Sequence, residues 1–223
     1  MIRAVIFDLD GVIVNSEPVH QRLENHMYEE LGLDLTPEFK QTLVGTSALD
    51  AWRMIGESYH LDKSPEELLL IGRGRYLEVL NAGGVPLSEG ALDLISRFRN
   101  HQYKILLASS ASSRTIAEVL RVHKLDEIFT LYIGGDQVSR SKPEPEIFLR
   151  IAEMGGVVPG ECLVIEDAYN GVKAAKKAGM FCIGFKNHFT GSQDLSLADA
   201  IVTNLDEITI DLVRGIESRG TGT

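Results

Sequence analysis

Two aspartates near the start of the chain, Asp8 and Asp10, are the first residues whose types and spacing indicate chemistry. They follow a short apolar run, residues 4–7, that is typical of a buried parallel strand. If the backbone stays extended, side chains two residues apart point to the same side. Two carboxylates held that close repel each other unless a cation or a shared proton relieves them. The pair therefore indicates a bound cation or a shared proton.

Polar residues also follow later apolar runs of the chain. In an open parallel sheet, functional groups gather outside the carboxyl ends of the strands, so we expect these residues to converge on one crevice. Carboxylates suit Mg²⁺, which prefers oxygen ligands, keeps several waters and is completed by substrate phosphate. A serine hydroxyl and a lysine ammonium suit phosphate oxygens. The converging residues are Asp8, Asp10, Ser109, Lys142, Glu166 and Asp167.

Strands and helices must position these residues. From about residue 87 onward, short apolar runs alternate along the chain with stretches of helical periodicity. Such alternation predicts β-α-β units around a parallel sheet. We therefore expect an α/β fold with a Rossmann-like parallel sheet core and helices on both faces. The predicted strands are residues 4–7, 105–108, 131–133, 163–165, 181–185 and 200–202.

Residues 16–82 interrupt the alternation and show only helix signals. Ser16 and Thr36 are predicted N-caps, Ser64 and Glu67 form a predicted capping box, and Gly32 ends the first helix. We expect an all-helical domain at residues 16–83 that is inserted into a core domain of residues 1–15 and 84–223. The two connections, near Asn15 and Gly83, are predicted hinges.

Composition narrows the class of function. The 223 residues are 44% hydrophobic and 24% charged, which is ordinary for a globular protein, and the net charge of −10 argues against nucleic-acid binding. No secretory signal or membrane span is visible. Cys162 and Cys182 lie in or beside apolar runs without metal-ligand spacing, so we expect reduced, buried thiols in a cytoplasmic protein and no zinc site.

The motifs together resemble a known family. The segment "DLDGV", the serine at position 109, "KPEPEIF" and "EDAYNGVKAAKKAG" resemble, in order and spacing, the four motifs of the haloacid dehalogenase superfamily. The helical insertion resembles the alpha-helical cap of the branch that contains beta-phosphoglucomutase and phosphoglycolate phosphatase. The resemblance covers essentially the whole chain.

The resemblance implies roles for the acidic residues. Asp8 attacks phosphorus and forms an aspartyl-phosphate, while Asp10 protonates the leaving oxygen and then activates water. Mg²⁺ is held by Asp8, the main-chain carbonyl of Asp10 and Asp167, with Glu166 nearby as a direct ligand or through water. Lys142 neutralises Asp8 and the phosphoryl oxygens, and the phosphate-binding residues are Ser109, Ser110 and Lys142.

The choice between a phosphatase and a mutase depends on the inserted domain. Members that cleave carbon–halogen bonds lack the second aspartate, so Asp10 favours phosphate esters. His20 stands where mutase relatives also carry a histidine. However, Ala48 stands where sugar-phosphate mutases carry an arginine, and the run at residues 111–113 lacks their lysine. The candidate substrate residues of the cap are Glu17, His20, Thr46 and Ser47.

A mutase must hold the far phosphate of a bisphosphate while the intermediate turns around. Each charge-assisted contact is worth roughly 1.5–3 kcal/mol, so the loss of two weakens that grip by several orders of magnitude. We therefore expect a Mg²⁺-dependent phosphatase that acts on a small phosphomonoester, with a beta-phosphoglucomutase-like mutase as the alternative. The arginines that could compensate from another direction are Arg53, Arg73, Arg75 and Arg114.

Two further alternatives are weaker. A phosphonate-cleaving relative needs a cap lysine near residues 17–20, and the cap lysines are Lys40 and Lys63. A catalytically silent binding protein would be free to lose charged groups from its crevice, whereas all of them are present. The expected partner is a small phosphorylated metabolite, with no nucleic acid and no membrane, and the expected state is a monomer.

Overall fold

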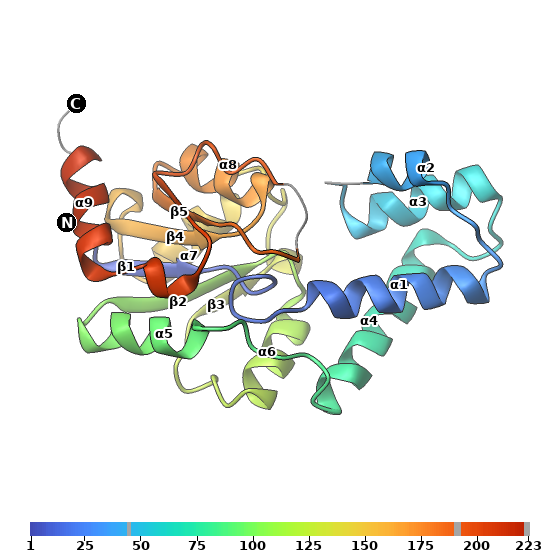
Figure 1. Cartoon of the computed structure of the whole chain (residues 1–223), viewed down its shortest axis with the longest axis horizontal. Helices are drawn as coiled ribbons and strands as arrows, with labels where there is room; N and C mark the ends of the chain where they lie inside the picture. The colour runs from blue at the N-terminus through green and yellow to red at the C-terminus, as the bar shows by residue number, and fades with distance from the viewer. Residues whose placement is uncertain (44–45, 190–192, 221–223) are drawn as a thin grey trace. The chain divides into compact units, whose positions relative to one another are not determined.

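The computed structural model describes residues 1–43, 46–189 and 193–220 (Figure 1). The chain divides into two compact units, unit 1 at Met1–Glu17 with Pro86–Thr223 and unit 2 at Pro18–Val85. The sequence predicts these boundaries after residues 15 and 83, and the clustering of contacts places them after residues 17 and 85. Within the described residues, none of the helices has the length and hydropathy that crossing a bilayer requires.

Unit 1 is built on a parallel sheet, which has six strands within the described residues. Their spatial order is β3-β2-β1-β4-β5-β6, so β1 lies in the middle between β2 and β4. Phe7 at the end of β1 is in register with Leu107 and Ile165, which places the carboxyl ends of these three strands at one edge. The strands are β1 Ala4–Phe7, β2 Lys104–Ser109, β3 Tyr132–Gly134, β4 Cys162–Glu166, β5 Phe181–Phe185 and β6 Ala200–Val202.

The helices of unit 1 follow the strands as the alternating pattern predicts, and the α/β fold class with a Rossmann-like sheet is confirmed. The first helix of this part of the chain begins at Ala91, directly after Gly90, which adopts a positive φ of 79°. Short 3₁₀ turns lie at Gly135–Gln137, Pro159–Glu161 and Leu205–Glu207. The α-helices are α5 Ala91–Asn100, α6 Ser113–Val122, α7 Glu146–Met154, α8 Tyr169–Lys177 and α9 Ile210–Gly220.

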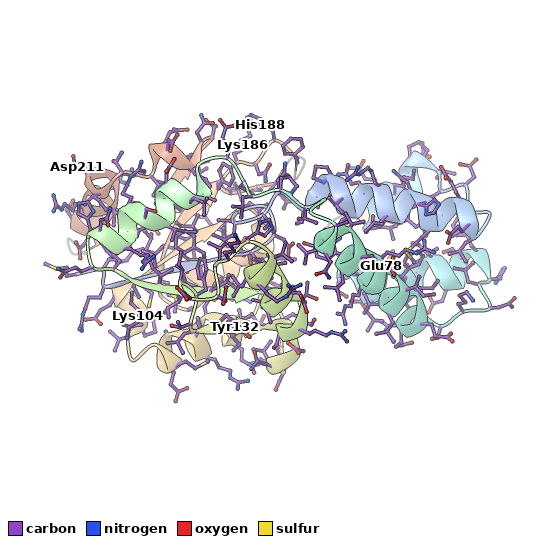
Figure 2. All side chains as sticks on the ribbon, turned by 90° about the horizontal axis from the view of Figure 1, so that it is seen from below. Glu78, Lys104, Tyr132, Lys186, His188 and Asp211 are labelled. Atoms are coloured by element: carbon purple, nitrogen blue, oxygen red, sulfur yellow. The ribbon has the colours of Figure 1, made fainter. Side chains whose placement is uncertain are left out.

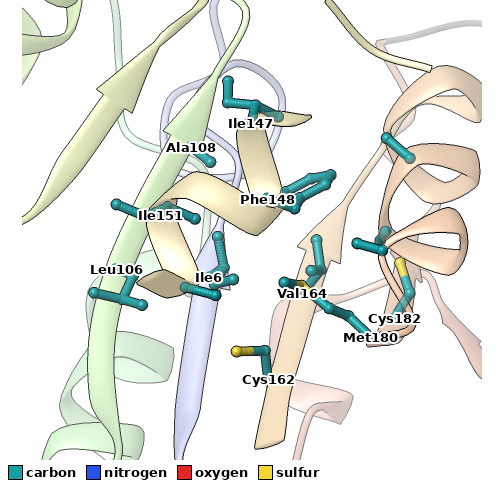
Figure 3. Packing of buried hydrophobic residues seen from close by; sticks show 14 of the residues in the cluster. Ile6, Leu106, Ala108, Ile147, Phe148, Ile151, Cys162, Val164, Met180 and Cys182 are labelled. Atoms are coloured by element: carbon teal, nitrogen blue, oxygen red, sulfur yellow. The ribbon is translucent and has the colours of Figure 1, made fainter. Parts of the chain in front are cut away.

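Alternate residues of the central strands pack on opposite faces of the sheet. On one face Ile6 belongs to a buried cluster with Phe148 and Ile151 of α7, as Figure 3 shows. On the other face the Phe7 ring meets the Phe98 ring of α5 edge-on, with centroids 6.1 Å apart. Because both faces are covered, β1 is apolar throughout, and its end is held rigidly at the carboxyl edge.

Both cysteines lie in this core as free thiols, as predicted. Cys162 and Cys182 are fully buried. Burial, with a smaller contribution from Glu161, raises the pKa of the Cys162 thiol to about 11. Both side chains therefore act as packing residues.

Unit 2 contains the helices α1 to α4 around a small apolar core. The Tyr28 ring meets the Trp52 ring edge-on with centroids 5.6 Å apart, so Trp52 packs between helices. The predicted capping box is present: Glu67 N–H donates to Ser64 Oγ at 3.2 Å, and Ser64 N–H donates to Glu67 Oε2 at 2.8 Å. The helices are α1 Glu17–Glu30, α2 Pro37–Leu43, α3 Ala48–Tyr59 and α4 Pro65–Asn81.

Other helix-end predictions in this region have mixed outcomes. Gly32 follows α1 with a φ of 65°, as expected for a residue that ends a helix. Thr36 Oγ1 accepts from Phe39 N–H at 3.2 Å, which confirms the predicted cap of α2. Ser16, however, donates its hydroxyl to Asp10 Oδ1 at 2.6 Å, and the described chain shows no hydrogen bond from the first turn of α1 to Ser16. Pro18, the second residue of α1, has no N–H to donate to a capping oxygen, which makes Ser16 a weaker cap than the sequence pattern predicts.

Candidate active site

The carboxyl edge of the sheet gathers the predicted residues of unit 1. Asp8 directly follows β1, and its N–H donates to the carbonyl of Ile165 on β4 at 3.0 Å. Glu166 is the last residue of β4, and Asp167 follows it. Three carboxylates therefore leave two adjacent strands at the same level, as parallel pairing requires.

Lys142 enters this group from the segment before α7. Its Nζ lies 2.5 Å from Asp8 Oδ1 and 2.7 Å from Glu166 Oε1, and it also donates to the Ala108 carbonyl at 3.3 Å. Its side chain is only 7% exposed. The Phe148 ring lies beneath the ammonium, with its centroid 5.0 Å away. Lys142 is thus a buried cation that joins the ends of β1 and β4.

The acids outnumber the cation. Asp8, Glu166 and Asp167 each offer an oxygen within 4.8 Å of the others, and all three residues are buried. Burial, opposed by Lys142 and reinforced by Glu166, raises the pKa of Asp8 from its usual 3.8 to about 8. Burial, then repulsion from Glu166 and Asp8, raises the pKa of Asp167 well above its usual range. The cluster therefore needs additional positive charge to keep its carboxylates ionised.

The donor set fits a hard divalent cation. Carboxylate oxygens in a compact, buried and electron-rich group are the ligands that Mg²⁺ takes in proteins. Burial would lower the pKa of Lys142, but Asp8 and Glu166 outweigh it and raise that pKa. Lys142 therefore stays charged, yet it balances only one of three acids. A bound cation would supply the remaining charge.

Asp10 lies on a tight turn beyond Asp8. It pairs with Val14 in an isolated bridge, and its Oδ1 accepts from Ser16 Oγ at 2.6 Å. Gly11 follows with a φ of 81°, and a Cβ added there would overlap the carboxylate of Asp167. Only glycine fits this close approach, because its φ is positive and a side chain would collide with Asp167.

The two predicted phosphate-binding serines differ in their surroundings. Ser109 ends β2, is 1% exposed, and accepts from Ala111 N–H through its Oγ at 3.0 Å. Ser110 is exposed, and a Cβ on Gly135 would overlap its main-chain carbonyl. Ser109 orders the loop after β2, and Ser110 presents its side chain at the surface of the same loop. Their binding of phosphate stays a prediction.

The sequence and the fold of this chain are similar to those of known proteins. A family model described as haloacid dehalogenase-like hydrolase matches residues 5–185. The chain belongs to the haloacid dehalogenase-like hydrolase family. This hydrolase is 30% identical over 218 residues to the beta-phosphoglucomutase of Bacillus subtilis, covering 95% of this chain and 94% of that protein.

Two other relatives differ in what their names describe. The hydrolase is 30% identical over 181 residues to the phosphorylated carbohydrates phosphatase of Thermotoga maritima, covering 80% of this chain and 82% of that protein. Its fold is similar to the crystal structure of CbbY from Rhodobacter sphaeroides in complex with phosphate. That pair has a TM-score of 0.80 and 25% identity, with 93% and 96% of the two chains covered.

The candidate residues of the cap have local partners in the described chain. The His20 ring stacks on the Tyr76 ring with centroids 4.6 Å apart and planes at 4°. Thr46 donates its hydroxyl to the Leu43 carbonyl at 2.7 Å, and Ser47 is the N-cap of α3. Glu17 is the first residue of α1, whereas Gly45 lies outside the described residues. Substrate contact by the cap residues stays a prediction.

Two polar residues near the carboxyl edge of the sheet were not predicted from the sequence to belong to the site. Ser16 contacts Asp10, and Asn187 donates its Nδ2 to the Gly11 carbonyl at 2.8 Å. Asn187 lies just beyond β5, at the same sheet edge as the other residues. A survey of polar residues after every predicted strand, extended to residues 181–185, would have included it.

Proposed function

We propose that this hydrolase is a Mg²⁺-dependent phosphatase that acts on a small phosphomonoester through an aspartyl-phosphate on Asp8. The observation that carries the proposal is the contact of Lys142 with both Asp8 and Glu166 in a buried, acid-rich group. A lysine in this position favours attack by an ionised carboxylate on an anionic phosphoryl group. Relatives named as a sugar-phosphate mutase and as a phosphatase of phosphorylated carbohydrates make phosphorylated sugars the first class to test.

The proposed reaction has two steps, transfer of the phosphoryl group to Asp8 and hydrolysis of the aspartyl-phosphate. An Asp8 oxygen attacks phosphorus as the bond from phosphorus to the leaving oxygen breaks, and Asp10 gives its proton to that oxygen. A water then attacks the phosphorus of the aspartyl-phosphate, Asp10 takes up a proton, and the bond from phosphorus to the Asp8 oxygen breaks. Lys142 offsets negative charge on Asp8 and the phosphoryl oxygens in both steps.

The metal would be held by Asp8, the main-chain carbonyl of Asp10, and Asp167. When bound, Mg²⁺ would neutralise phosphoryl charge and orient the ester for in-line attack. Both oxygens of Glu166 already have partners, since Oε1 contacts Lys142 and Oε2 accepts from Ala168 N–H at 3.0 Å. We therefore assign Glu166 to the orientation of Lys142, with any contact to the metal made through water.

Hydrolysis is preferred over mutase chemistry because Ala48 replaces the arginine of the mutases, and two of the four arginines that could compensate are already engaged with carboxylates. Arg53 is paired with Asp50, and Arg75 with Glu30 at 2.6 Å. An arginine already engaged with a carboxylate gains less from a phosphate than a free one would. The acceptor of the phosphoryl group is then water.

The test is a turnover screen over phosphate esters with Mg²⁺, using the unmodified protein and Asp8→Asn. The amide is a poor nucleophile, so we expect Asp8→Asn to lower kcat by about 10³-fold or more. Asp126→Asn makes the same change of type and charge at an exposed residue and should retain activity. Full activity in Asp8→Asn would contradict the mechanism.

A second arm of the screen separates the two reactions. Phosphate release from several esters, without interconversion of hexose 1- and 6-phosphates, is the expected result. Efficient interconversion that depends on a bisphosphate primer would show a mutase and overturn the choice of water as acceptor.

A further inference from the structure

The loop after β5 carries a buried amide that reaches the active-site turn. Asn187 is 6% exposed, whereas its neighbours Lys186 and His188 are exposed (Figure 2). Its Nδ2 donates to the carbonyl of Gly11 at 2.8 Å. Its Oδ1 accepts from the N–H of Phe189 at 2.9 Å. One side chain therefore closes its own turn and holds a second loop.

This contact joins strands that are not neighbours. β4 lies between β1 and β5, so Asn187 links the loops on either side of the strand that ends in Glu166. The loop is itself anchored, because Lys186 N–H donates to the Val202 carbonyl on β6 at 2.8 Å. The amide can thus transmit the rigidity of the sheet to the loop after β1.

Gly11 is fixed from three sides. Its N–H donates to the Val14 carbonyl at 2.8 Å, and the Asp167 carboxylate fills the space where a Cβ would lie. Asn187 holds its carbonyl. Because Asp10 directly precedes Gly11, the direction of the Asp10 side chain depends on this turn.

We propose that Asn187 is a positioning residue, which holds the Gly11 carbonyl so that Asp10 is aimed at the leaving oxygen. The inference rests on the proposed function, because it takes Asp10 as the proton donor. The amide is suited to the task since it donates to one main-chain group while it accepts from another. A serine at this position can still close the turn to Phe189 but is too short to reach Gly11.

The experiment measures kcat/KM with Mg²⁺ for para-nitrophenyl phosphate and phenyl phosphate. The two esters share a ring, but only the phenolate leaving group of phenyl phosphate is basic enough to need a proton. The ratio kcat/KM covers the steps up to departure of the leaving group. The variants are Asn187→Ser, Asn187→Ala and Asp10→Asn, with Phe189→Ala as a control in the same loop.

General acids typically contribute roughly 10²–10⁴-fold, so a misdirected Asp10 should lower kcat/KM for phenyl phosphate about 10-fold more than for the nitro ester. We expect this selective loss in both Asn187 variants and a larger one, in the same direction, in Asp10→Asn. Phe189 is 51% exposed, and its truncation leaves both hydrogen bonds of Asn187 in place. Its selectivity between the esters should equal that of the unmodified protein.

Equal losses on both esters in the Asn187 variants, with or without a lower Tm, would show a purely structural role and overturn the inference. If Asp10→Asn is selective but neither Asn187 variant is, the inference alone fails. If Asp10→Asn also loses equally on both esters, or the unmodified protein hydrolyses neither, the proposed function fails and the inference with it. Should one Asn187 variant not fold, the other decides.

Discussion

At the scale of single residues, the unequal count of acids and cations at the sheet edge governs the chemistry. Lys142 contacts Asp8 and Glu166, yet the pKa of Asp8 still rises to about 8, chiefly because the carboxyl is buried. Under the proposed mechanism, in which Asp8 is the nucleophile, ionisation of Asp8 near neutral pH would depend on charge supplied from outside the chain. A bound cation would supply that charge and favour the ionised carboxylate.

The Glu166 carboxylate also depends on a neighbouring glycine. Gly171 lies in the first turn of α8, and a Cβ there would overlap Glu166 Oε1. On helix propensity alone, Gly171→Ala would stabilise the protein by up to about 1 kcal/mol. We expect the reverse, because Glu166 is held by Lys142 and Ala168 and cannot move aside freely. Gly171→Ala should lower kcat about 10-fold or more and lower the free energy of unfolding by about 1–3 kcal/mol.

The matched control is Gly215→Ala in α9, where an added Cβ meets nothing within 4 Å. Urea denaturation should show it equal to or more stable than the unmodified protein, with unchanged kcat. If Gly171→Ala behaves like Gly215→Ala, the close packing of Glu166 against α8 contributes neither to kcat nor to the free energy of unfolding.

At the scale of elements, strand ends explain why the site could be predicted. Asp8 and Glu166 each stand at the end of an apolar run, and parallel pairing brings such ends together without any knowledge of side-chain detail. Lys142 is harder to place from periodicity, because it lies in a loop well after β3, and the resemblance of its motif supplied its role. The alternation of runs was sufficient for the sheet and its helices.

Contacts between distant loops were not predictable in the same way. Asn187 and Gly11 are 176 residues apart, and nothing local in either segment indicates their hydrogen bond. Ser16 shows a related difficulty, because its hydroxyl donates to the Asp10 carboxylate, and the signals of a helix start do not indicate this contact. Helix ends such as Ser64 were predictable because the partner lies three residues away.

The capping box of α4 provides a prediction at this scale. Ser64→Ala removes the acceptor for Glu67 N–H at the start of a 17-residue helix. N-cap substitutions of this kind cost about 1 kcal/mol, so we expect that loss in the free energy of unfolding and faster amide exchange in the first turn of α4. Ser58→Ala, at an exposed position within α3, should be neutral or slightly stabilising. Equal behaviour of the two variants would contradict a stabilising cap.

At the scale of the whole molecule, metal binding at the acidic cluster would stabilise the folded protein. An ion that binds only the folded state stabilises it by about 2.7 kcal/mol at 100 times its Kd. For a chain of this length, that corresponds to a rise in Tm of about 5 °C or more. We therefore expect Mg²⁺ to raise the Tm of chelator-treated protein measured by calorimetry.

The variant Asp167→Asn should change Tm differently in the absence and in the presence of Mg²⁺. Without metal, it should raise Tm, because one of three mutually repelling carboxylates becomes neutral. With metal, it should abolish most of the Mg²⁺-induced rise. Asp126→Asn, an exposed substitution with the same change of charge, should alter neither value. A Mg²⁺ response that survives in Asp167→Asn would place the ion elsewhere.

The central place of β1 in the sheet has a consequence for biosynthesis. β1 is synthesised before both of its ladder partners, which begin at Lys104 and Cys162. One edge of β1 therefore lacks its partner until β2 is made, and the other edge lacks its partner until some 150 residues have been added, counted from Phe7 to Cys162. Throughout that interval the nascent strand presents four consecutive apolar residues, a segment that molecular chaperones would have reason to shield. The residues of unit 2 are synthesised during this interval. A truncated message that stops before Cys162 would yield a polypeptide whose first strand never gains its second neighbour.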